Sequence, residues 1–168
     1  MREQRIDFLI TEIAKNNSDA VAELFASIKN GVYAFLYPYF NNRADTEDCL
    51  QTTFLKICNS ASCYQPHTNG RAWIFQIAKN TALDALRREK STVNVDDLPE
   101  KGREMPQTFV FDAMQRVLDV EENTIVVLHV LWGYRHREIA TMLNCPVGTV
   151  TSKYKRAVEK LKRELKEN

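Results

Sequence analysis

The side chains with the clearest chemical capacity are the bases near the C-terminus. Seven lysines and arginines lie between Lys153 and Lys166, against the two acids Glu159 and Glu164. Such side chains form charge-assisted hydrogen bonds to phosphate groups, so the run suits a polyanionic partner. The same composition also occurs on solvated helices whose charges pair four residues apart. The run alone leaves both interpretations open.

Apolar residues give this segment a second face, because they recur at intervals of three and four residues. They are Val147, Val150, Tyr154, Ala157, Leu161 and Leu165. The opposite face of the expected helix carries Ser152, Lys155, Arg156, Glu159 and Arg163, flanked by Thr149, Thr151 and Lys153. The spacing predicts an amphipathic helix that packs on a core and presents a cationic, hydrogen-bonding surface.

A shorter helix is expected just before it, with Ile139, Ala140 and Leu143 on a narrow apolar stripe. Asn144-Cys145-Pro146 ends that helix, and proline suits the first turn of a new one. Two helices joined by a tight turn predict a helix-turn-helix whose second helix enters the DNA major groove. The candidates for DNA contact are Thr149, Thr151, Ser152, Lys153, Lys155 and Arg156.

The bulk properties exclude several other classes of protein. The net charge is only +1, so the DNA prediction depends on where the bases gather. Four cysteines and three histidines complete no zinc spacing, and no nucleophile motif or phosphate-binding glycine loop is present. We therefore expect no metal, no cofactor and no enzymatic activity. No apolar run approaches the roughly 18 residues that span a membrane, and the charged N-terminus resembles no signal peptide, which predicts a cytoplasmic protein.

The first half of the chain shows helical spacing over residues 18–37, 44–58 and 71–88, with a turn at Asn41-Asn42 and a loop over 59–70. In 44–58, one face is apolar, whereas Asp48, Gln51, Thr52 and Leu55 point elsewhere, as on an ordinary solvated face. In 71–88, Trp73 is either a core residue or part of a platform on which unpaired bases stack.

Residues 91–108 have two prolines, one glycine and no apolar periodicity, which is typical of a flexible linker. The predicted fold is therefore all-α, with two small helical domains over residues 1–90 and 109–168. Each domain is near the lower size limit for a self-sufficient core.

From about Asp19 to Leu165 the chain resembles a sigma factor of bacterial RNA polymerase, in the extracytoplasmic-function group of the sigma-70 family. Residues 43–55 resemble the family's region 2.2, and residues 71–88 resemble regions 2.3 and 2.4. The stretch from Gly133 to Ala157 resembles region 4.2. It departs from the family in its basic Arg135-His136-Arg137, where a small polar residue and acids are usual.

The resemblance implies a factor that binds core polymerase and directs promoter-specific initiation of transcription. Region 2.2 would contact the beta-prime clamp helices, and the beta flap is a further expected polymerase contact of the chain. The expected polymerase contacts are Asp48, Gln51, Thr52, Phe54 and Leu55. Residues 59–88 would take the non-template strand of the minus-10 element and help to melt it, with contacts from Trp73, Lys79, Asn80 and Arg87.

The helix-turn-helix would read the minus-35 element as duplex. Core polymerase and promoter DNA are thus the expected partners, and an anti-sigma factor is a further one. The alternative is a helix-turn-helix repressor or activator that works without polymerase, which would need no contact face over Asp48–Leu55.

Overall fold

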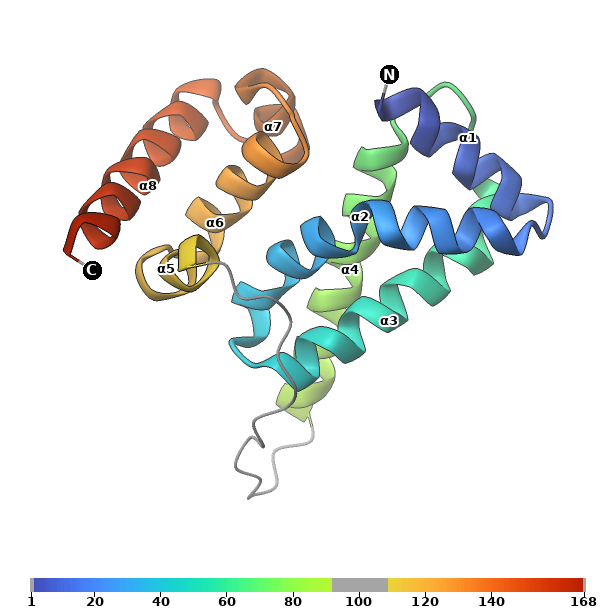
Figure 1. Ribbon diagram of the computed structural model, residues 1–168, viewed down its shortest axis with the longest axis horizontal. Coiled ribbons are helices and arrows are strands. Elements are labelled where there is room, and N and C mark those ends of the chain that lie inside the picture. The colour runs from blue at the N-terminus through green and yellow to red at the C-terminus, as the bar shows by residue number, and fades with distance from the viewer. Residues whose placement is uncertain (1, 92–108, 168) are drawn as a thin grey trace. The chain divides into compact units, whose positions relative to one another are not determined.

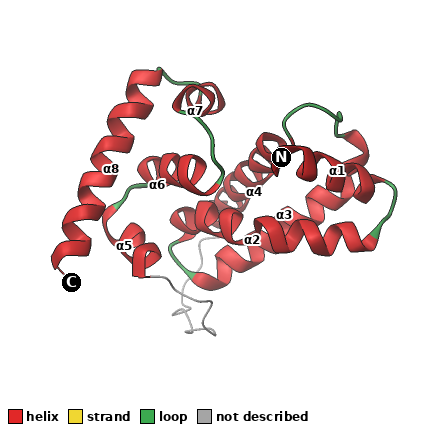
Figure 2. Cartoon of the chain, turned by 45° about the horizontal axis from the view of Figure 1, so that its top comes forward, coloured by secondary structure: helices red, strands yellow, loops and turns green. Residues whose placement is uncertain are grey.

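The computed structural model describes residues 2–91 and 109–167, and within these ranges the chain forms helices and no strands (Figures 1 and 2). The described residues fall into two compact units, one on each side of residues 92–108. The all-α prediction is therefore confirmed. The predicted linker, apart from Ser91, lies outside the described residues.

The first unit contains four α-helices and a short 3-10 turn. They are α1 (Arg2–Ala14), α2 (Ser18–Phe40), α3 (Arg43–Ser60), η1 (Ala61–Cys63) and α4 (Gly70–Ser91). Its core centres on Phe35 of α2 and Phe75 of α4, whose ring centroids lie 4.6 Å apart. Leu24, Ile57 and Ile74 are also fully buried, so α2, α3 and α4 each give one apolar face to the same core.

Asparagines set the helix boundaries in this unit. The Asn42 side chain accepts a hydrogen bond from the Asp45 N–H at 2.9 Å and so caps α3. Asn41 adopts the left-handed conformation, with φ 54°, that ends α2. The turn predicted at Asn41-Asn42 is confirmed.

The structure differs from the sequence prediction at two places in this unit. Helix α1 was not predicted, although Ile6, Leu9, Ile10 and Ile13 bury one of its faces. Helix α2 does not end at Tyr37 but continues through Pro38 to Phe40. Pro38 is buried, and its missing N–H affects only the last turn, so packing offsets the loss.

The second unit contains the predicted helix-turn-helix. Its elements are α5 (Phe109–Val117), α6 (Val120–Val126), the π-helical η2 (Val127–Leu131), α7 (His136–Leu143) and α8 (Val147–Glu167). Gly133 and Asn144 have positive φ, of 77° and 50°, and turn the chain before and after α7. Ile139 of α7 and Val150 and Ala157 of α8 are buried together with Leu128. The helix-turn-helix formed by α7 and α8 therefore packs on an apolar core.

Three aromatic rings join η2, α7 and α8. The ring centroids of His129, His136 and Tyr154 lie 4.8–5.0 Å from one another. The Nδ1 of His129 lies 2.7 Å from the Tyr134 carbonyl, so this nitrogen carries the donated proton. The Nδ1 of His136 lies 3.2 Å from the Thr151 hydroxyl, and its Nε2 is buried with no hydrogen-bond partner among the described residues. An imidazolium at His136 would thus add an unpaired buried charge.

We expect acid to destabilise the second unit through His136. Burial, and then the neighbouring His129, lower the pKa of His136 below the ordinary value of 6.5. Between these two pKa values the unfolded chain binds the proton more readily, so the stabilisation is complete above about pH 6.5 and is lost as the pH falls through the folded-state pKa. Thermal unfolding from pH 8 to pH 5, followed by circular dichroism, should show a flatter profile for His136→Phe than for the wild type.

The matched control is His67→Asn, which removes an exposed histidine from the first unit and keeps a residue that tolerates φ 64°. Its pH profile should match the wild type. An unchanged slope in His136→Phe would show that other groups govern the acid sensitivity.

Candidate nucleic-acid and partner interfaces

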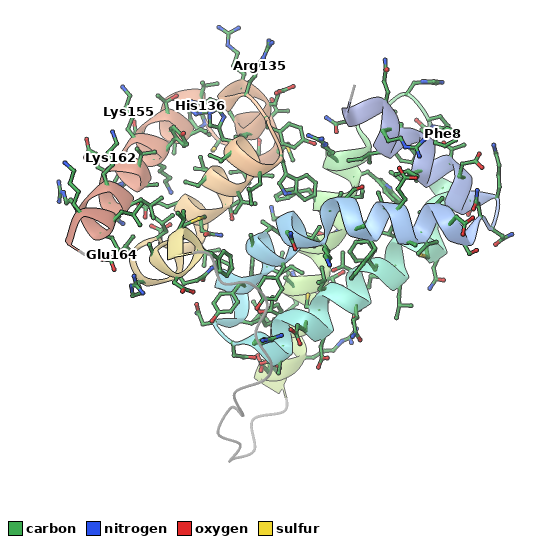
Figure 3. All side chains as sticks on the ribbon, viewed as in Figure 1. Phe8, Arg135, His136, Lys155, Lys162 and Glu164 are labelled. Carbon is green, nitrogen blue, oxygen red and sulfur yellow. The ribbon has the colours of Figure 1, made fainter. Side chains whose placement is uncertain are left out.

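Helix α8 has the two faces that the sequence predicts. Val150 and Ala157 are buried, whereas Ser152, Lys155 and Arg156 are exposed. Lys155 and Lys162 project away from the rest of the unit (Figure 3). One expectation was wrong: Val147, predicted to pack on the core, is 42% exposed because it is the first residue of α8. The exposed face offers hydroxyls and cations along one helix, as a major-groove reader requires.

Two of the flanking candidates on α8, Thr151 and Lys153, are bound within the unit, while Thr149 is half-buried. Thr151 is half-buried and its hydroxyl meets the His136 ring. Lys153 is half-buried and forms an ion pair with Glu121 of α6. The structure therefore places Lys153 toward α6 rather than on the exposed face. Ser152 remains exposed, although its hydroxyl donates to the Gly148 carbonyl at 2.8 Å.

Glu122 of α6 is a buried acid that ties α8 to the core. Its side chain is 1% exposed, and Lys160 donates to its Oε2 at 2.7 Å. Its carboxylate also accepts from the Asp119 N–H, as part of a capping box that begins α6. The Nε of Arg156 lies 3.2 Å from Oε1, an ion-pair distance without hydrogen-bond geometry. Lys160 is therefore a structural residue, whereas the Arg156 side chain, 58% exposed, also reaches solvent.

Helix α3 presents a mostly polar surface with one large apolar residue. Asp48, Gln51 and Thr52 are exposed, and Leu55 is 64% exposed. The prediction that Phe54 belongs to this surface is corrected by the structure. Phe54 is buried, and its ring meets Phe25 edge-on with centroids 4.7 Å apart. Its position between Leu50 and Ile57 on the apolar stripe explains why it turns inward.

A hollow of about 350 Å³ lies between α3 and α4, beside this surface. Its lining mixes acids with two bases, Lys56 and Arg88. The Nζ of Lys56 lies 3.5 Å from the Oδ2 of Asp84, so some of the charges that line the hollow are paired within the unit. Asp48 and Thr52, two of the residues predicted to contact polymerase from α3, line this hollow.

The residues predicted to contact the minus-10 element lie along α4. Asn80 and Arg87 are exposed, and Lys79 is half-buried. The Asn80 side chain accepts from Gln76 at 3.1 Å, which leaves its donor end toward solvent. Trp73 falls between the two alternatives of the sequence analysis, because it is half-buried and packs on Tyr64 with ring centroids 5.2 Å apart.

The loop before α4 is held by residues that the sequence analysis missed. Residues 65–68 are exposed, but Tyr64 on one side and Gly70 on the other both donate to Asp7 of α1. The apolar spacing of Ile6, Ile10 and Ile13 was the available signal for α1. No sequence signal connects Asp7 with donors 57 and 63 residues away.

The described ranges contain neither a metal-binding group nor a membrane span. Residues 2–91 and 109–167 hold no group of three or more His, Cys, Asp or Glu side chains arranged to bind a metal ion. No helix in that part of the chain is both long enough and apolar enough to cross a bilayer.

Comparison with known proteins agrees with this arrangement. Residues 24–92 match the family model of sigma-70 region 2, and residues 111–161 match that of sigma-70 region 4. The chain is 31% identical over 159 residues to the RNA polymerase sigma factor CarQ of Myxococcus xanthus, covering 89% of this chain and 91% of CarQ. It is 24% identical to the ECF RNA polymerase sigma factor SigW of Bacillus subtilis, covering 98% and 99% of the two chains.

Two solved structures share the fold. CnrH, in complex with the cytosolic domain of CnrY, matches with a TM-score of 0.65 at 22% identity, covering 98% of this chain and 99% of CnrH. The sigma factor RpoE of Bartonella quintana, in complex with the anti-sigma factor NepR, also gives 0.65, at 21% identity, covering 89% and 98%.

The two candidate faces, on α3 and α8, thus lie in regions that the sigma-70 family models match. The relatives match across both units, and the matched models cover the helices that carry the exposed faces of α3 and α8. The chain belongs to the sigma-70 family of RNA polymerase sigma factors, in the extracytoplasmic-function group, and is an alternative sigma factor that directs transcription initiation.

Proposed function

We propose that this sigma factor binds core polymerase through the exposed face of α3, melts the minus-10 element with residues 59–88 and reads the minus-35 duplex with α8. It acts in the cytoplasm by binding rather than by catalysis. The domains are then residues 1–90 for polymerase binding and minus-10 melting, and residues 109–168 for minus-35 recognition.

The single observation that carries the proposal is the exposed Leu55. A leucine that is 64% exposed on an otherwise polar helix face costs solvation free energy in the free chain. Binding to another protein removes that cost, and a central apolar residue ringed by polar ones is the usual pattern of such interfaces. The sigma-factor relatives suggest the beta-prime clamp helices as the partner.

Helix α4 has the groups that strand capture needs. Extruding a base from the duplex costs a few kcal/mol, which contacts in a pocket must offset. The exposed amide of Asn80 can both donate to and accept from a base edge. Trp73 offers an aromatic ring, and Lys79 and Arg87 offer charges for phosphates.

The remaining partners of the proposal follow from the second unit and from the relatives. The beta flap is the expected polymerase contact of that unit, while α8 meets the minus-35 duplex. The structure of the Bartonella quintana relative includes an anti-sigma factor. We therefore include an anti-sigma factor among the proposed partners of this chain.

The test of polymerase binding is reconstitution of the full chain with bacterial core polymerase. Leu55→Arg should lower the affinity for core about tenfold or more, because it places a solvated charge at the centre of the interface. Phe8→Arg is the matched control, since it changes another large hydrophobic residue of the first unit, 50% exposed on α1. Affinity is measured by fluorescence anisotropy of labelled protein.

Two results would contradict this assignment. Equal core affinity for Leu55→Arg and wild type would remove α3 as the contact face. Binding to duplex DNA together with no core binding by the wild type would favour the polymerase-independent regulator.

Asn80→Ala should impair promoter melting but not assembly with core. Promoters are first identified by mapping the transcripts that the reconstituted polymerase makes from genomic DNA. On such a promoter the variant should open the duplex about five- to tenfold more slowly, since one base-edge contact is worth roughly 1–3 kcal/mol. Permanganate reactivity of unpaired thymines measures the opening. A template with a mismatched minus-10 bubble should restore much of the activity, and full opening of the duplex by Asn80→Ala would refute the role.

Lys155→Ala and Lys160→Ala separate the DNA contacts of α8 from its structural bonds. Lys155 is exposed, whereas Lys160 is bonded to Glu122. A phosphate contact contributes about one to the slope of log affinity against log salt. With the reconstituted polymerase on minus-35 duplex, Lys155→Ala should lower this slope by about one, and Lys160→Ala should leave it unchanged. The reverse result would place the DNA on a different face of α8.

A further inference from the structure

Asp7 of α1 joins two points that lie far from it along the chain. Its Oδ1 accepts one hydrogen bond from the Tyr64 hydroxyl and another from the Gly70 N–H at 3.0 Å. Tyr64 and Gly70 bound the stretch 65–69, most of which is exposed. One carboxylate oxygen therefore holds both ends of this loop.

The packing around Gly70 allows little movement at this point. A Cβ at residue 70 would lie 2.7 Å from the Asp7 Oδ1 and 3.0 Å from side-chain carbons of Ile6 and Ile10. A side chain at residue 70 would therefore have to displace the Asp7 carboxylate that accepts the hydrogen bond. The first residue of α4 is thus pressed against α1 where Asp7 accepts its hydrogen bond.

Tyr64 connects this contact with the expected base-binding side chains. Its side chain is buried, and its ring lies 5.2 Å from that of Trp73 at an interplanar angle of 53°. Burial, and then the hydrogen bond to Asp7, raise the pKa of Tyr64 to about 12. The hydroxyl therefore stays protonated and remains a donor to Asp7 at neutral pH. With Tyr64 fixed, Trp73 has a fixed neighbour on one side of its ring.

We propose that Asp7 is a positioning residue for strand opening: it holds loop 65–69 and the Tyr64–Trp73 pair in place before the extruded base arrives. The inference rests on the proposed minus-10 role of residues 59–88. A loop that is ordered in advance spares the complex the entropy of ordering it on binding. Helix α1 precedes residues 24–92, which the region 2 model matches, so the match assigns Asp7 no role.

A purely structural role for Asp7 predicts a different outcome. Helix α1 buries Ile6, Leu9, Ile10 and Ile13, so it keeps an apolar contact with the unit when the carboxylate is removed. Arg5 also pairs with Glu23 of α2 at 2.5 Å. Loss of Asp7 should therefore free the loop while α1 stays packed. If Asp7 only stabilised the packing of α1, removing its carboxylate would change the thermal stability and leave strand opening at saturating protein unaffected.

Three variants of the full chain, assembled with core polymerase, test the proposal. Asp7→Ala removes the shared acceptor, and Tyr64→Phe removes one donor while keeping the ring. Asp7→Asn keeps an acceptor oxygen in the same place and should rescue. Arg5→Ala is the matched control, because it breaks the exposed tie between α1 and α2 without touching the loop. Duplex opening is followed with 2-aminopurine in the minus-10 element, beside core affinity and binding of minus-35 duplex.

We expect Asp7→Ala and Tyr64→Phe to slow opening about fivefold or more, as the loss of a hydrogen bond worth roughly 1 kcal/mol predicts. Core affinity and minus-35 binding should stay within about twofold of wild type, and Asp7→Asn and Arg5→Ala should open the duplex normally. Wild-type opening rates in both Asp7→Ala and Tyr64→Phe would overturn the positioning role alone. Failure of the polymerase reconstituted with the wild type to initiate at any site on genomic DNA would overturn the proposed function, and this inference with it.

Discussion

Each unit has to bury a sufficient core with only a few helices, and this constraint governs the rest of the structure. A small domain gains little apolar burial per residue, so each helix must commit one whole face to packing. In α8 that face includes Val150 and Ala157, and in α3 it includes Leu50 and Ile57. The opposite faces, with Lys155 on one helix and Leu55 on the other, are then available to partners.

A half-buried carboxylate in the first unit and a buried one in the second complement this apolar packing. Asp7 and Glu122 lie on early helices of their units, and each bonds to a later helix that carries an expected DNA contact. A hydrogen bond to a charged group is directional and stronger than a neutral one. Apolar burial therefore brings the helices together, while these acids fix how α4 and α8 are placed within their own units.

Helical periodicity predicted much of the fold, because it records which side of a helix is apolar. It located α2, α3, α4, α7 and α8 and the exposed face of α8. It did not reveal which side chains meet across the core, since those contacts join distant parts of the sequence. The turn of Lys153 toward Glu121 and the contact of Asp7 with Tyr64 both depend on tertiary packing. Only the structure could show them.

Two cations of α8, Arg156 and Lys160, lie beside the buried Glu122, so its charge has more than one partner. A single cation there could not turn to a phosphate without leaving a lone negative charge, 1% exposed, inside the unit. Lys160 holds Oε2 at 2.7 Å independently of Arg156. In the proposed DNA complex, Arg156 could therefore exchange its carboxylate partner for a phosphate while Lys160 still neutralises Glu122, so DNA binding need not weaken the fold.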